Sequence, residues 1–257
     1  MVTLNPIFRH FAISEPSVGS HEASTQRMTL HGILSRTALL LFMFTACAAF
    51  SWIEGGRFQH GDQYANLYLV LAALSCSISS LVLVWITVYK KTWSPVTAPA
   101  YALMQGFVVG LISVGMDRLY PNIAIQAVGL TVSICFCLLG AYGSGLIRVT
   151  ESFNKKLAVA TSGVFVYYLV IFFLAVVSRS TLFIITGRTP GIIVSIIIVI
   201  IAAMNLVSNF DFAVQCSTDR FPKYMEWYAA LGLVVTLIWL YIETLNLLSR
   251  TRESDQQ

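Results

Sequence analysis

The chain has little charge, and several long stretches of it have none. Of its 257 residues, 11% are charged and 57% are hydrophobic, whereas a soluble domain carries roughly 25% charged residues. A soluble protein of this composition would have too few charged side chains to cover its surface. The scarcity of charge therefore excludes an ordinary soluble domain and indicates a protein embedded in a lipid bilayer.

Seven runs are predominantly apolar, and only the last contains an acidic or basic residue, Glu243. They cover residues 37–53, 63–89, 92–116, 119–147, 157–178, 189–210 and 227–248. A helix needs about 20 mostly apolar residues to cross the hydrocarbon layer, where its backbone groups must be paired internally. Strands of a membrane barrel would alternate over about 10 residues, and these runs do not alternate. The sequence predicts an all-α integral membrane protein, a bundle of seven transmembrane helices.

The remaining segments are short. We expect residues 1–30 to form a polar, partly disordered N-terminal tail and residues 251–257 to form a polar C-terminal tail. Residues 31–250 then form one membrane domain.

The sequence also lacks the usual signs of an enzyme. None of the four histidines falls within the seven runs, whereas an intramembrane zinc hydrolase needs histidine ligands at membrane depth. A phosphate-binding glycine loop with its lysine is missing as well. We therefore expect no enzymatic activity and no cofactor, with calcium the one ion that could be bound or transported.

Lysine and arginine predict the orientation. With the N-terminus in the cytoplasm, ten basic residues lie on the cytoplasmic side and six on the other. The ten are Arg9, Arg27, Arg36, Lys90, Lys91, Arg148, Lys155, Lys156, Arg220 and Lys223. The positive-inside rule favours this orientation. We read the net charge of +4 as a sign of topology and expect no nucleic-acid partner.

Small residues recur at helix-contact spacing in the third run. Gly106 and Gly110 form a GxxxG pattern, and Ser113 continues the same face. This pattern lets two helices approach closely, and packing inside the bundle is a more common reason for it than dimerisation.

Three acidic residues lie at or near membrane depth, where ionisable groups are costly and mark functional sites. They are Asp211 late in the sixth span, directly after its charge-free run, Glu226 in the first turn of the seventh span and Glu243 late in the seventh. Ser208, Asp211 and Gln215 share a helical face that could line a polar cavity. We expect Asp211 and Glu226 to lie on the same side and to share a proton or a calcium ion, or else to pair with Arg220 or Lys223 at the interface.

Glu243 should lie near the opposite membrane face. It is roughly 25 Å from Glu226 along one helix. Thr236 and Asn246 share its face, so a hydrogen-bonded structural cluster is as consistent with this position as a binding site.

Several stretches resemble the bacterial branch of the Bax inhibitor family. They are Met28–Leu41, Ala98–Gly106, Ser144–Thr161, Asn209–Phe212 and Pro222–Arg250. The resemblance implies seven helices with the last one central, and a proton-sensitive calcium leak in the bacterial inner membrane. It also implies a pH-sensing pair of acids on the last two helices. Asp211 matches the first acid, whereas the second position falls on Val234 or Val235 in a gap-free match and on Glu243 in a shifted one.

The chain departs from the family pattern in three further places. Gln105 precedes Gly106 where the family usually has glutamate, and Asn209 stands where the branch often has aspartate. Residues 63–89 lack the arginine that some relatives place beside the acidic pair. Two functions follow as hypotheses. One is a pH-sensitive cation leak centred on Asp211. The other is a non-conducting regulator that binds membrane partners such as a membrane-bound protease.

Overall fold

The computed structural model describes residues 28–58, 63–177, 188–218 and 221–255, and these form seven long helices. In chain order they are α2 (Leu30–Phe58), α3 (Gln63–Tyr89), α4 (Ser94–Leu119), α5 (Ile123–Gly143), α6 (Glu151–Val177), α8 (Arg188–Thr218) and α9 (Met225–Asp255). A single 3-10 turn, η1 (Lys91–Trp93), joins α3 to α4. All seven helices are long and apolar enough to cross a membrane, which confirms the predicted fold class.

Helix α2 begins at Leu30, well before the charge-free run that starts at Thr37. The hydroxyl of Thr29 accepts a hydrogen bond from the backbone N–H of Gly32 at 3.0 Å. This is the usual cap of a helix N-terminus, because the first N–H groups of a helix have no partner within it. The early start places Arg36 inside the first helix. Residues 1–27 of the expected tail, 1–30, lie outside the described residues, whereas its last residue, Leu30, already begins α2. Helix α9 runs on to Asp255, inside the segment expected as the C-terminal tail.

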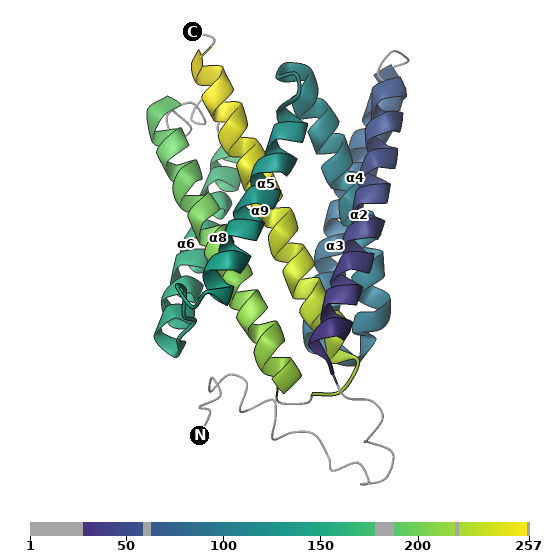
Figure 1. Cartoon of the computed structure of the whole chain (residues 1–257). Helices are drawn as coiled ribbons and strands as arrows, with labels where there is room; N and C mark the ends of the chain where they lie inside the picture. Colours follow the sequence, from purple (N-terminus) through teal and green to yellow (C-terminus); the bar gives the residue numbers. More distant parts are fainter. Residues whose placement is uncertain (1–27, 59–62, 178–187, 219–220, 256–257) are drawn as a thin grey trace.

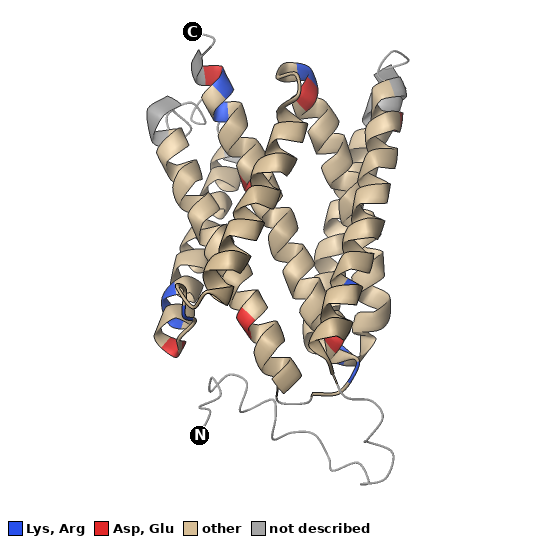
Figure 2. Ribbon diagram, in the orientation of Figure 1, with Lys and Arg blue, Asp and Glu red and all other residues tan. Residues whose placement is uncertain are grey.

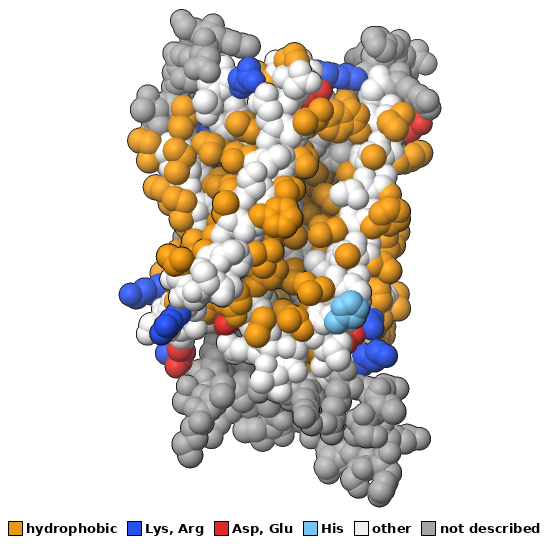
Figure 3. Space-filling view, viewed as in Figure 1, with side chains coloured by type: hydrophobic (Ala, Val, Ile, Leu, Met, Phe, Trp, Pro, Cys, Tyr) orange, Lys and Arg blue, Asp and Glu red, His pale blue; other side chains and the backbone are white. Residues whose placement is uncertain are grey.

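Charge lies mainly near the two ends of the bundle. Figure 2 shows most basic and acidic residues close to these ends, and Figure 3 shows hydrophobic side chains over the middle of the visible face. Many large apolar side chains of the helices are exposed, including Phe42, Ile78, Phe136 and Phe165. In water this surface would be unfavourable, whereas in a bilayer it contacts lipid.

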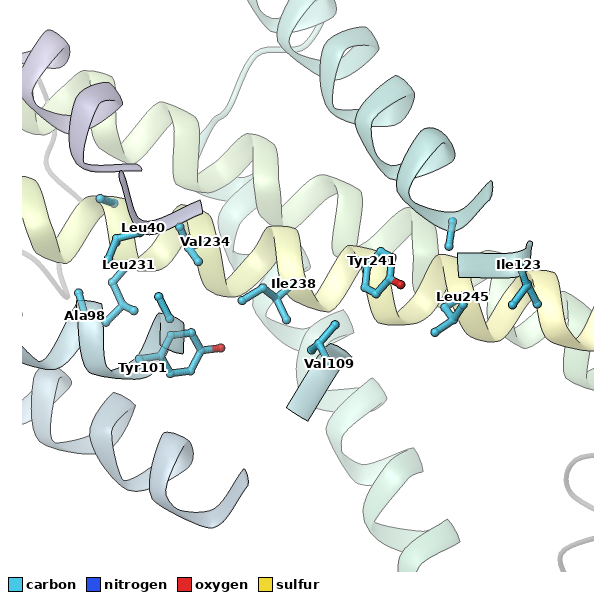
Figure 4. Packing of buried hydrophobic residues seen from close by; sticks show 13 residues of the cluster. Leu40, Ala98, Tyr101, Val109, Ile123, Leu231, Val234, Ile238, Tyr241 and Leu245 are labelled. Atoms are coloured by element: carbon cyan, nitrogen blue, oxygen red, sulfur yellow. The ribbon is translucent and has the colours of Figure 1, made fainter. Parts of the chain in front are cut away.

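Helix α9 lies at the centre of the packing. It crosses between α5, α6 and α8 on one side and α2, α3 and α4 on the other (Figure 1), and it packs closely on α2, α4, α5 and α8. Val234, Ile238 and Leu245 of α9 are almost fully buried in the core shown in Figure 4. The other side chains labelled there on neighbouring helices are Leu40, Ala98, Tyr101, Val109 and Ile123.

The two glycines of the GxxxG pattern face helix α2. A Cβ on Gly106 would lie 2.5 Å from the carbonyl oxygen of Phe44, and one on Gly110 would overlap the carbonyl oxygen of Ala48. The GxxxG pattern therefore serves packing within the bundle, where small residues let two backbones approach. Ser113 instead forms a 2.7 Å hydrogen bond with the hydroxyl of Tyr241 on α9.

Candidate functional site

Asp211 lies on a polar face of helix α8, as its spacing from Ser208 and Gln215 predicts. One carboxylate oxygen accepts a 2.9 Å hydrogen bond from the hydroxyl of Tyr142, at the end of α5. The other accepts a hydrogen bond from the side-chain amide of Gln215. One turn earlier, the Ser208 hydroxyl donates to the Asn154 side-chain oxygen at 2.9 Å, which ties α8 to the start of α6. The donors to Asp211 are thus neutral and come from two helices.

A cavity of about 330 Å³ opens beside this face. It lies between α3, α6, α8 and α9, at the end of the bundle where α6 and α9 begin. Its polar lining comprises Thr87, Asn154, Ser208, Asn209, Asp211, Gln215, Tyr228 and Thr236. Asp211 is the one charged side chain in the described lining of this cavity. The cavity therefore offers a single carboxylate among neutral amide and hydroxyl oxygens.

Asn209 joins α8 to the central helix beside the cavity. Its side-chain amide donates to the backbone oxygen of Gly232 at 3.2 Å and to the hydroxyl of Thr236 at 3.3 Å. A further α8 residue, Asn205, donates to the hydroxyl of Thr161 on α6 at 2.8 Å. Polar contacts thus connect α6, α8 and α9 along one wall of the cavity and for about one turn beyond it.

Glu226 does not share this cavity with Asp211, contrary to the expected pairing. Its carboxylate is almost fully buried and forms a 2.7 Å ion pair with the Nε of Arg36 on helix α2. The backbone N–H and the hydroxyl of Thr29 also donate to it, at 3.0 and 3.3 Å. The guanidinium of Arg36 lies 4.8 Å from the centroid of the Trp227 ring. The expected partner Arg220 lies outside the described residues, and the cation that pairs with Glu226 within the described part of the chain is Arg36 instead of Lys223.

The reason for the separation is the rotation of helix α9. Residues advance by about 100° around an α-helix, so Tyr228 and Val235, which line the cavity, lie about half a turn around from Glu226. Glu226 consequently faces α2 while they face α8. This geometry is readable from the spacing alone, and sequence reasoning missed it by considering only membrane depth.

Glu243 lies apart from both other acids. Its two carboxylate oxygens accept hydrogen bonds from the Tyr168 hydroxyl of α6 at 2.7 and 2.9 Å, and the Trp239 indole N–H donates to one of them at 3.0 Å. It follows Gly232, a cavity residue, by roughly 16 Å along the helix axis. Thr236, expected to share its cluster, bonds to Asn209 instead. The structure thus brings none of the three acids together.

A model of the family described as Bax inhibitor 1 like matches residues 5–253, nearly the whole chain. The chain belongs to this family. Searches of curated proteins and of solved structures found no match. Family membership agrees with the seven-helix fold, whereas the site residues rest on the geometry described above.

The resemblance implies a second acid near Asp211, but no second acid is in the described lining of the cavity. Val235 lines the same cavity as Asp211, whereas Glu243 is not among the lining residues. Of the candidate positions for the second acid, Val235 is thus the one at this cavity, and it is apolar. Gln105, where the family usually has glutamate, accepts a 2.9 Å hydrogen bond from Ser80 and joins α4 to α3.

Proposed function

We propose that this Bax inhibitor family protein is a pH-sensitive cation leak, with Ca²⁺ as the expected ion and Asp211 as the group that responds to protons. The observation that supports the proposal is the cavity in which this half-buried carboxylate lies among amide and hydroxyl oxygens. Oxygen ligands of these kinds suit Ca²⁺. Such a role requires no catalytic residue and no cofactor.

A site with a single carboxylate suits the passage of Ca²⁺ better than its tight binding. Tight calcium sites gather several carboxylates, and a site with fewer charged ligands binds Ca²⁺ more weakly. Conduction requires an ion to enter favourably and still leave. One carboxylate beside neutral oxygens provides a weak attraction of that kind.

Protonation of Asp211 would change both charge and contacts. The carboxylate accepts hydrogen bonds from Tyr142 and Gln215, and a protonated oxygen loses much of its strength as an acceptor. The contact between α5 and α8 would weaken as the cavity loses its negative charge. In this proposal low pH reduces cation entry, and rising pH restores it.

Flux in proteoliposomes tests the proposal directly. Wild-type protein should carry Ca²⁺ with a rate that depends on pH, and Asp211→Asn should flatten that dependence while lowering the maximal rate about tenfold. The matched control is Glu253→Gln, the same acid-to-amide change at an exposed position at the other end of the bundle, which should behave as wild type. Equal, pH-independent traces for all three proteins would contradict the leak and favour the alternative, a non-conducting regulator of a membrane-bound protease.

The proposal places the N-terminus and the start of α6 in the cytoplasm of a bacterial inner membrane. Lys156 is exposed near the start of α6, and Glu253 is exposed near the end of α9. In a cysteine-free background, a membrane-impermeant thiol reagent added to intact cells should label Glu253→Cys and leave Lys156→Cys unlabelled. Labelling of the second variant from outside would reverse the orientation.

A further inference from the structure

A second hollow lies on the outer side of helix α3, at the end of the bundle that also holds the Asp211 cavity. Its volume is about 380 Å³, and its lining is Val82, Trp85, Ile86, Tyr89, Lys90 and Trp93. Trp85, Tyr89 and Trp93 are each more than half exposed. Trp85 and Tyr89 stack with their ring centroids 5.9 Å apart. The hollow is thus an aromatic groove that faces away from the protein core.

A lysine stands at the edge of this groove. The 3-10 turn brings Trp93 back towards Lys90, with a 3.0 Å hydrogen bond from the Trp93 N–H to the Lys90 carbonyl. The Lys90 ammonium then lies 4.9 Å from the centroid of the Trp93 ring. This cation–π contact holds a positive charge beside the groove. No acidic residue is in the described lining.

The depth of the groove is that of a membrane interface. The apolar span of α3 ends at Tyr89, and tryptophan and tyrosine favour the boundary between hydrocarbon and headgroups. Val82 and Ile86 lie towards the middle of the span, and Lys90 lies just beyond its end. A ligand in the groove would therefore contact apolar side chains on the side of the membrane centre and a positive charge on the side of the membrane surface.

We propose that this groove binds an anionic phospholipid, with its phosphate at Lys90 and an acyl chain along Val82, Trp85 and Ile86. A basic pocket at the end of a span suits such headgroups. The charge discriminates against phosphatidylcholine, because its ammonium would approach Lys90 and because the Trp93 ring already carries a cation. The opposite side of the same helix end supplies Thr87 and Val88 to the Asp211 cavity, so a bound lipid would lie next to that wall.

Lipid competition measured by native mass spectrometry tests the site. Purified protein in detergent receives equal amounts of phosphatidylglycerol and phosphatidylcholine with matched acyl chains. Wild type should retain phosphatidylglycerol preferentially, and Lys90→Gln should reduce the preference about fivefold, as expected for one basic residue near a lipid surface. Trp93→Leu, which keeps an apolar side chain and removes the ring, should reduce it roughly threefold.

The matched control is Lys156→Gln, an exposed lysine at the same end of the bundle and outside the groove. It should keep the wild-type preference. Equal losses in Lys90→Gln and Lys156→Gln would show diffuse attraction and overturn the site, as would a wild type that retains both lipids equally. Excess inorganic phosphate should leave the bound lipid in place, and full displacement would show that the groove recognises a free anion. Since binding is measured without flux, the result is independent of whether the protein conducts ions.

Discussion

Asp211 and Glu226 lie near the same end of the bundle, yet their surroundings differ in kind. Glu226 is buried against the cation of Arg36 and also accepts hydrogen bonds from Thr29. Asp211 is half-buried beside a cavity and accepts hydrogen bonds from the neutral side chains of Tyr142 and Gln215. The comparison shows that depth in the membrane does not by itself identify a functional acid. A carboxylate with a fixed counter-charge stabilises the packing, whereas one with neutral partners beside a cavity is the better candidate for the proposed role.

Stability should separate the two acids most clearly. Glu226→Gln leaves the guanidinium of Arg36 without its counter-charge, and breaking a buried pair costs about 3 kcal/mol of unfolding free energy. Asp211→Asn, whose donors are neutral, should change it by at most about 1 kcal/mol. Thermal unfolding in detergent measures both.

The control for Glu226→Gln is Glu151→Gln, which breaks the exposed 2.9 Å pair with Lys155. Such surface pairs contribute at most about 1 kcal/mol. If Glu226→Gln destabilises the protein no more than Glu151→Gln does, then the buried ion pair does not set Glu226 apart from Asp211.

A methyl group beside Glu226 should also disturb its site. A Cβ on Gly32 would overlap the Glu226 carboxylate, so Gly32→Ala should cost about 2 kcal/mol, as overpacking usually does. Gly129→Ala in helix α5 meets nothing within 4 Å and should be neutral or slightly stabilising, because alanine favours a helix by about 1 kcal/mol over glycine. Equal unfolding temperatures for the two variants would show that Glu226 has room to move.

A second carboxylate in the Asp211 cavity should raise its affinity for Ca²⁺. Val235→Asp places an acid on the α9 wall of the same cavity, and more charged ligands raise calcium affinity. We expect about a tenfold gain in Ca²⁺ binding by isothermal titration calorimetry, or about 1.4 kcal/mol. Val235→Asn controls for size and polarity without charge and should bind as wild type does. If both variants bind equally, Asp211 does not face this wall.

The fold was predictable because each helix that crosses a bilayer needs about 20 mostly apolar residues in a row. Each of the seven apolar runs became one long helix. The spacing of Gly106 and Gly110 predicted a close helix contact within the bundle, and the structure identifies the partner as α2. The polar face of Ser208, Asp211 and Gln215 followed from helical periodicity in the same way.

The partners of the acids were harder to predict because they come from distant segments. Arg36 lies 190 residues from Glu226 in the sequence, and Tyr142 lies 69 residues from Asp211. Spacing within one helix carries no information on such contacts. Helical periodicity could only have excluded a contact. Glu226 and Val235 lie about half a turn apart around α9, so they do not face the same cavity.

The ion pair between α2 and α9 joins the first and last spans of the chain, and a backbone hydrogen bond from Met28 to Phe221 reinforces it at 2.9 Å. Helix α2 is synthesised long before its partner, so the ribosome delivers Arg36 to the membrane ahead of the carboxylate that neutralises it. A nascent or truncated chain that ends before Glu226 carries an uncompensated arginine. The finished protein differs from such incomplete chains in that this arginine is paired with a carboxylate.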